Sequence, residues 1–167
     1  RAESADSTAF ILLQVCRGYY ARSYDVAGQP RRLEVWRIPE ADLWMEFVDL
    51  PDRSRCGISP DERVIAVPRS DHSIGLFDLR SRQEIRRIEI EGDGGYIQFD
   101  STGRLLVRFH DSSSPTEIHD LQTRTVTQAF SGVHIGYALA WTSDGAMMAG
   151  ANLLRVQLWD AVHQRPA

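Results

Sequence analysis

The sequence predicts an all-β fold built from four consecutive units of short antiparallel strands. An aromatic or histidine side chain lies near the end of one apolar run in each unit, at Trp36, Phe77, His119 and Trp159. The intervals between these positions are 41, 42 and 40 residues, a spacing regular enough to indicate an internal repeat. Turn residues separate the short apolar runs about every 8 to 12 residues, as in all-β proteins. No long window shows the apolar period of about 3.6 residues that is typical of a helix.

The first unit, about residues 4–50, is expected to lack its first strand. The segment "SADS" (4–7) reads as the turn that precedes a second strand over residues 9–15. The strand that would come before this turn is therefore missing. A third strand reaches Trp36, and the alternating run 44–48 is interpreted as the fourth.

The second and third units, about residues 54–91 and 95–131, are predicted to be complete. Strands are expected in the second unit over residues 55–59, 63–67, 73–79 and 83–90. The third unit repeats this order and ends with strands over residues 116–121 and 125–130. The turn between the first two strands recurs in step with the repeat, at Glu62, Gly103 and Gly145. Asp, Ser and Gly suit such turns because they bond to the nearby backbone or adopt positive φ.

The fourth unit, about residues 135–167, is expected to stop after its third strand, which ends at "WDA". The predicted strand counts are therefore three, four, four and three. Unpaired backbone in the incomplete units predicts a surface that another chain or segment covers. Three arrangements follow: part of a larger ring, association with a second copy or another chain, or an open or small four-unit structure.

The stretch "DHSIGLFDL" (71–79) holds the most specific motif, with Asp71, Ser73, Phe77 and Asp78. These residues match positions of the WD40-repeat family of β-propellers, which the chain resembles over nearly its whole length. The matching positions in the other units are Trp36, His119, Asp120, Trp159 and Asp160. The resemblance implies degenerate, bacterial-type repeats that form a partial propeller of about four blades. The family's Gly-His pair is absent, and Arg37 stands where Asp usually follows the aromatic residue.

The stretch 16–32 is interpreted as a long binding loop between the second and third strands of the first unit. It carries a local charge of +3, from Arg17, Arg22, Arg31 and Arg32 against Asp25, together with Tyr19, Tyr20 and Tyr24. In propellers this loop shares a rim with further candidate binding residues: Arg53, Arg69, His72, Arg108 and His110. Tyr and Arg are enriched at binding hot spots, and Arg matches carboxylate and phosphate, so an acidic or phosphorylated partner is predicted. The alternative is a surface loop whose tyrosines fold back on the blade.

The composition argues against several classes of protein. A net charge of −4 on 167 residues disfavours a dedicated nucleic-acid binder. No apolar run reaches the roughly 18 residues of a membrane span. Cys16 and Cys56 form neither a disulfide framework nor a zinc spacing, so a reducing, cytoplasmic location is expected. All 19 basic residues are arginines, a bias typical of GC-rich bacterial genomes.

The expected function is a non-catalytic scaffold for protein–protein interaction. The sequence contains no nucleophile elbow, phosphate-binding loop or metal-ligand spacing, so no enzymatic activity, metal or cofactor is predicted. Its partner is expected to be another protein or the remaining blades of a larger propeller. The alternative function is a propeller-type small-ligand sensor or hydrolase domain, which needs polar side chains that converge at the inner strands.

Overall fold

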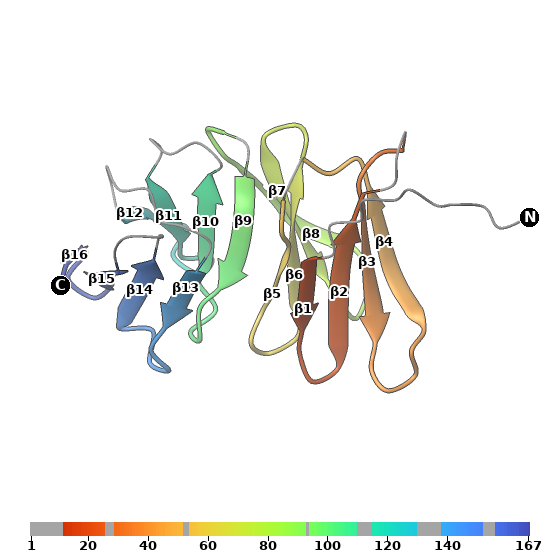
Figure 1. The fold of residues 1–167 in the computed structure, drawn as a ribbon, viewed down its shortest axis with the longest axis horizontal. Coiled ribbons are helices and arrows are strands. Elements are labelled where there is room, and N and C mark those ends of the chain that lie inside the picture. Colours follow the sequence, from red (N-terminus) through yellow and green to blue (C-terminus); the bar gives the residue numbers. More distant parts are fainter. Residues whose placement is uncertain are drawn as a thin grey trace, which may run out of the picture.

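Four sheets follow one another along the chain in the computed structural model (Figure 1). The structure describes residues 12–25, 29–51, 54–92, 94–109, 115–129, 138–151 and 156–167. Within these ranges each sheet has four antiparallel strands, every strand pairs with the next one in sequence, and no helix occurs. The first and fourth sheets stand at opposite ends of the molecule, with the second and third between them (Figure 1). The all-β prediction is confirmed, and the arrangement is propeller-like.

The strands are short, and turns of a few residues join most of them. In chain order they are β1 (Leu12–Val15), β2 (Tyr19–Tyr24), β3 (Arg32–Arg37), β4 (Leu43–Val48), β5 (Gly57–Ile58), β6 (Val64–Arg69), β7 (Ser73–Asp78), β8 (Glu84–Glu89), β9 (Gly94–Phe99), β10 (Leu105–Phe109), β11 (Thr116–His119), β12 (Val126–Ala129), β13 (Ala138–Trp141), β14 (Met147–Ala151), β15 (Val156–Asp160) and β16 (Arg165–Pro166).

The prediction of an incomplete first unit is wrong. The run expected as a second strand is β1, the first strand of the sheet, and it pairs with β2. Strand β2 lies inside the stretch 16–32, so this stretch is not a long loop. Along β2, Tyr19, Ala21 and Ser23 alternate with Tyr20, Arg22 and Tyr24. Tyrosine is a residue that favours strands. Arg22 therefore lies on a face of this strand and not in a loop.

The prediction of an incomplete fourth unit is also wrong. Strand β16 pairs with β15 through Trp159 opposite Pro166 and Asp160 opposite Arg165. The strand has only two residues, and an Arg-Pro pair carries no alternation of polar and apolar residues. Such a strand leaves no pattern in the sequence. Its position follows from the turn that brings it back beside β15.

The turn between the third and fourth strands contains a residue in the left-handed backbone region in all four sheets. One residue in each turn has a positive φ: Ala41 (54°), Arg82 (62°), Arg124 (61°) and Gln164 (54°). Asp78, Asp120 and Asp160 begin three of these turns, and each Oδ1 accepts hydrogen bonds from two backbone N–H groups at 2.6 to 3.1 Å. These bonds lower the pKa of the three carboxyl groups. The recurring Asp therefore closes the turn.

Other repeat positions vary more between the sheets. Arg37 takes the place of Asp in the first sheet and forms two hydrogen bonds with Asp42, at 2.6 and 3.0 Å. In the second sheet, Ser73 Oγ donates to Asp71 Oδ1 at 2.5 Å. In the third sheet, His119 is buried and its Nε2 lies 2.8 Å from Glu117 Oε2. Local polar pairs of this kind replace a uniform network across the repeats.

The turn between the first and second strands contains Gly103 in the third sheet and Gly145 in the fourth. Their φ values are 87° and 68°, but their surroundings differ. A Cβ atom at Gly145 would lie 2.8 Å from Thr102 Cγ2 and 3.1 Å from Arg104 Nη2, whereas a Cβ at Gly103 would meet no atom within 4 Å.

We therefore expect Gly145→Ala to destabilise the protein more than Gly103→Ala. Positive φ alone costs alanine about 1 kcal/mol at both positions, and the contact with Thr102 adds to this cost only at Gly145. Urea denaturation of both variants measures the difference in the free energy of unfolding. Equal losses would contradict the prediction, because they would mean that Thr102 and Arg104 move aside without cost.

Apolar side chains fill the space between neighbouring sheets. Three clusters of buried residues occupy the three junctions. Leu33 and Val35 of the first sheet share a cluster with Phe77 of the second. Ile118 of the third sheet shares a cluster with Trp159 of the fourth. In the second and third sheets, alternate residues of a strand therefore face the sheet before it and the sheet after it, as Phe77 and Leu76 do on β7.

Hydrogen bonds between sheets repeat with the same period as the sequence. Trp44 Nε1 donates to the Leu79 carbonyl oxygen at 2.6 Å, across the first junction. Arg86 Nη1 donates to the Leu121 carbonyl oxygen at 3.0 Å, across the second. The two donors are 42 residues apart in the sequence, and so are the two acceptors. The sheets therefore stack in the same relative orientation at these two junctions.

Candidate protein-binding face

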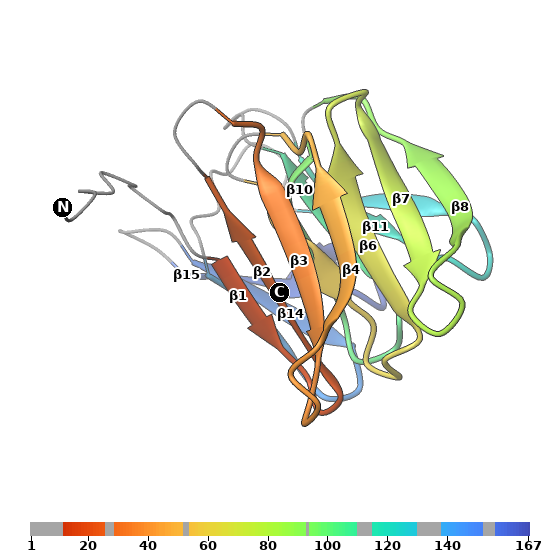
Figure 2. The same ribbon diagram turned by 90° about the vertical axis from the view of Figure 1, so that its right-hand side faces the viewer.

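Tyr20, Arg22 and Tyr24 lie on one face of β2, and this face is turned away from the second sheet. They stand opposite Trp36, Glu34 and Arg32 of β3, respectively. The alternate residues of the same strands, including Ala21, Leu33 and Val35, are buried against the second sheet. We call the first set the outer face of the first sheet. Figure 2 shows this sheet in front, with β1 to β4 side by side.

The other residues of the predicted binding loop are placed elsewhere. Tyr19 packs against the core between the first and second sheets. Arg17 lies in the turn before β2, where its backbone N–H donates to Glu62 Oε1 at 2.6 Å. Arg31 is buried, with Nε 3.6 Å from Asp25 Oδ1.

Of the rim candidates from the other units, the two whose side chains the structure describes, Arg69 and His72, belong to the second sheet and its turn. Arg69 ends β6 and forms an ion pair with Glu84 at 2.8 Å. His72 is exposed in the next turn, with a φ of 58°. Arg53 and His110 lie outside the described residues. Arg108 belongs to β10, and its side chain is outside the described part of the chain.

Glu34 organises the outer face of the first sheet. Its Oε2 accepts hydrogen bonds from Arg22 Nε at 2.7 Å and Trp36 Nε1 at 2.8 Å. Its Oε1 accepts the Tyr24 hydroxyl at 2.7 Å. The same carboxylate forms an ion pair with Arg22 Nη2 at 2.7 Å. Glu34 is buried, and these three donors all belong to β2 and β3.

The aromatic rings of this face are held in stacked positions. The Tyr20 and Trp36 rings are nearly parallel, 4° apart, with their centres 6.1 Å from each other. The Arg22 guanidinium lies 5.4 Å from the centre of the Trp36 ring and 5.5 Å from that of Tyr24. Such cation–π contacts add to the ion pair with Glu34. The side chains are therefore ordered before any partner binds.

The hydrogen bonds around Glu34 shift two pKa values. Burial raises the pKa of Glu34, but the hydrogen bonds from Tyr24, Trp36 and Arg22 outweigh it, so the net shift is downward. The hydrogen bond to Glu34 raises the pKa of Tyr24. Glu34 is therefore ionised and Tyr24 protonated at neutral pH.

Both arginines of this face already have a carboxylate partner. Arg22 pairs with Glu34, and Arg32 Nη1 lies 2.7 Å from Glu46 Oε1 on β4. The charges of these four residues therefore cancel, which removes the reason to expect an acidic or phosphorylated partner here. What the face offers instead is ordered aromatic surface, bordered by the exposed side chains of Val15 and Val48.

Sequence reasoning missed Glu34 as a residue of the site. If the stretch 16–32 is a loop, the sequence position of Glu34 does not show which side chains lie next to it. With β2 recognised as a strand, alternation would have placed Tyr20, Arg22 and Tyr24 on one face. Glu34 and Trp36, two residues apart on the neighbouring strand, would then face them.

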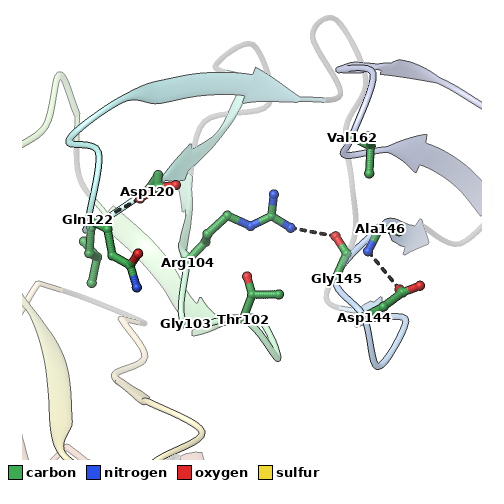
Figure 3. Close-up of a pocket in the computed structure, with 10 residues that line it drawn as sticks. Thr102, Gly103, Arg104, Asp120, Gln122, Asp144, Gly145, Ala146 and Val162 are labelled. Atoms are coloured by element: carbon green, nitrogen blue, oxygen red, sulfur yellow. Dashed lines mark hydrogen bonds between the residues drawn. The ribbon is translucent and has the colours of Figure 1, made fainter.

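A hollow of about 270 Å³ lies between turns of the third and fourth sheets (Figure 3). Arg104 reaches across it, and its Nη2 donates to the Gly145 carbonyl oxygen at 2.6 Å. Asp120 and Asp144, which also line it, accept hydrogen bonds from backbone N–H groups of their own turns. Arg104 therefore joins the two sheets, while the two carboxylates close their own turns.

A second hollow, of about 320 Å³, lies between the first and second sheets. Phe47, Leu50 and Val67 contribute its apolar part, while Arg69 and Asp71 line it at the rim. Arg69 is paired with Glu84, and Asp71 accepts hydrogen bonds from Ser73 and Arg87. Asp71 is thus paired, whereas the buried Nε of Arg69 has no hydrogen-bond partner among the described residues.

The remaining chemical features are few. Among the described residues, no group of three His, Cys, Asp or Glu side chains could hold a metal ion. Cys16 and Cys56 are free thiols. Burial raises the pKa of Cys56 to about 12 and also raises that of Cys16, so both stay protonated at neutral pH. The described part of the chain contains no helix long and apolar enough to cross a bilayer.

Comparison with known proteins gives a fold relationship. No family model and no curated protein matches the chain. Among solved structures, the chain is similar to hydrazine synthase from Kuenenia stuttgartiensis, with a TM-score of 0.68 and 13% sequence identity. The match covers 88% of this chain and 44% of that one, so this chain spans less than half the length of its structural neighbour. At this identity the likeness shows that the two proteins share a fold.

Proposed function

We propose that the chain is a non-catalytic protein-interaction module, a WD40-like arrangement of sheets whose contact surface is the outer face of the first sheet. The observation that carries the proposal is the network around Glu34, which holds Tyr20, Arg22, Tyr24 and Trp36 in place on a partly exposed sheet face. Aromatic residues and Arg dominate binding hot spots because each combines a large contact area with a polar group. Ordering them in advance lowers the entropy cost of binding.

Two further features support the proposal. The repeat interval near 41 residues and the Asp that closes the third-to-fourth-strand turn fit the WD40 pattern. The free thiols of Cys16 and Cys56 fit a reducing compartment such as the cytoplasm. The proposed partner is a protein that presents an apolar, largely uncharged surface, since the charges of the outer face are paired within the sheet.

The contact surface can be tested with peptides selected from a random displayed library on the immobilised wild-type chain. We expect Trp36→Ala to weaken the selected peptides about tenfold or more, because truncation of a hot-spot aromatic residue costs about 2 kcal/mol or more. Surface plasmon resonance at low protein concentration measures the affinities. Ile85→Ala, which truncates an exposed apolar residue on β8, is the matched control and should leave them unchanged. Equal affinities for wild type and Trp36→Ala would remove this face as the binding surface.

A further inference from the structure

The outer face of the fourth sheet exposes apolar residues at positions that are buried in the other sheets. Val156 is 70% exposed and Leu158 is 50% exposed on β15. They follow Thr116 and Ile118 of β11 by 40 residues, and those follow Ile74 and Leu76 of β7 by 42. All four of these earlier residues are buried. The first sheet has buried Leu33 and Val35 at the same positions, 41 residues before β7.

The neighbouring strand shows the same equivalence. Ala149 stands opposite Leu158, as Ala21, Ala66 and Leu106 stand opposite Val35, Leu76 and Ile118. The three earlier residues are fully buried, and Ala149 is partly exposed. The fourth sheet therefore carries the alanine and the aliphatic pair that the first and second sheets bury against the sheet that follows them.

A residue at the recurring aromatic position packs with this pattern at the first and third junctions within the chain. Phe77 lies in one cluster with Leu33 and Val35, and Trp159 lies in one cluster with Ile118. The buried residue at this position in the third sheet is His119. Trp36 is the equivalent residue of the first sheet, 41 residues before Phe77, and it remains partly exposed on the outer face.

We propose that the outer face of the fourth sheet binds the outer face of the first sheet of a second copy of this chain. Trp36 of one copy packs on Val156 and Leu158 of the other, as Phe77 packs with Leu33 and Val35 within the chain. Each copy supplies one face of each kind, so two equivalent contacts join two copies head to tail in a closed pair. This inference rests on the proposed function, since it names the partner that the outer face of the first sheet meets.

The charged residues of the first sheet are compatible with such a contact. Glu34 accepts three hydrogen bonds within its own sheet, and Arg22 and Arg32 each have a carboxylate partner. Covering the face therefore buries no lone charge, which would be costly. The small side chains Ala140 and Ala149 on the fourth sheet leave room for the bulkier Tyr20 and Trp36.

Sedimentation equilibrium of the chain and its variants tests the proposal. We expect a dimer for the wild type and at least a tenfold increase in the dissociation constant for both Leu158→Arg and Trp36→Asp. Ile85→Arg adds a charge at an exposed apolar site outside both faces and should leave the dimer unchanged. Circular dichroism confirms that each variant is folded.

Cysteine pairing provides a second measurement that does not depend on charged substitutions. In chains carrying Cys16→Ser and Cys56→Ser, a Trp36→Cys copy mixed with a Leu158→Cys copy should form the mixed disulfide. Each copy alone should form little homodimeric disulfide, because neither face meets its own kind.

Three outcomes would overturn the proposal: a wild-type monomer throughout the concentration range, a dimer insensitive to Trp36→Asp, or homodimeric disulfides between like copies as abundant as the mixed one. None of these decides the proposed function, because the peptide measurement reads the effect of Trp36→Ala independently of dimer formation. Conversely, a dimer lost in both charged variants would support the contact even if no peptide were selected.

Discussion

Replacing Asp100 with alanine is expected to lower the free energy of unfolding by about 3 to 5 kcal/mol, the cost of breaking a buried ion pair by removing one partner. Asp100 is 1% exposed, and its Oδ1 accepts hydrogen bonds from Thr102 N, Thr102 Oγ1 and Arg104 N at 2.8 to 2.9 Å. Its Oδ2 accepts Arg104 Nε at 2.6 Å. Through Arg104, which also reaches the Gly145 carbonyl oxygen, this carboxylate joins the third sheet to the fourth.

Guanidinium denaturation of Asp100→Ala and wild type measures this loss. Asp144→Ala is the matched control. Asp144 also lies in the turn between the first and second strands of its sheet, where it accepts hydrogen bonds from Thr142 Oγ1 and Ala146 N, but its side chain is exposed. Its loss should be much smaller. A loss for Asp100→Ala no larger than that of the control would contradict the view that the buried carboxylate holds the junction.

Replacing Glu34 with glutamine is expected to lower the free energy of unfolding by about 1 to 3 kcal/mol, because it removes the charge that three donors share and leaves Arg22 without its carboxylate. Glu46 stands opposite Glu34 on β4 and pairs with Arg32 where both side chains are more than a third exposed. Glu46→Gln should therefore cost less than about 1 kcal/mol. Urea denaturation of both variants at neutral pH measures the difference, and equal small losses would show that the network contributes little.

The pH dependence of the Glu34 variant follows from the lowered pKa of Glu34 in the folded protein. A group with a depressed folded-state pKa stabilises the fold above its unfolded-state value, about 4.3 for Glu, and this contribution disappears as the pH falls through the folded-state value. The stability difference between wild type and Glu34→Gln should therefore be constant near neutral pH and shrink below about pH 4. A difference that persists unchanged in acid would show that packing, and not the charge, is responsible.

Much of the fold could be predicted from the sequence because the residues that recur with the repeat determine the backbone close to themselves. The turn residues Glu62, Gly103 and Gly145 and the closing residues Asp78, Asp120 and Asp160 each determine the backbone within a few positions of themselves. Their spacing therefore gave the unit length and the order of most strands. The predicted and observed strands differ at β16, which has no apolar alternation, and at β2, whose aromatic and charged residues resemble those of a binding loop.

The candidate site was predicted in part. Tyr20, Arg22 and Tyr24 were identified by residue type, which indicates binding wherever these residues gather on a surface. Their separation from Tyr19 and Arg31, and their attachment to Glu34, depend on which face of β2 is turned outward. Which face is turned outward depends on the pairing of β2 with β3, and residue type alone does not predict this pairing.

The sequence by itself determined the class of the fold, the length of the repeat and the turns that separate its strands, because short-range hydrogen bonds and backbone preferences decide these features. Only the tertiary structure decided which faces remain uncovered. Val156 and Leu158 have the same pattern as their buried counterparts in the earlier sheets, and Trp36 matches Phe77 and Trp159. Whether such residues are buried depends on the presence of a neighbouring sheet, a long-range property that no local pattern contains.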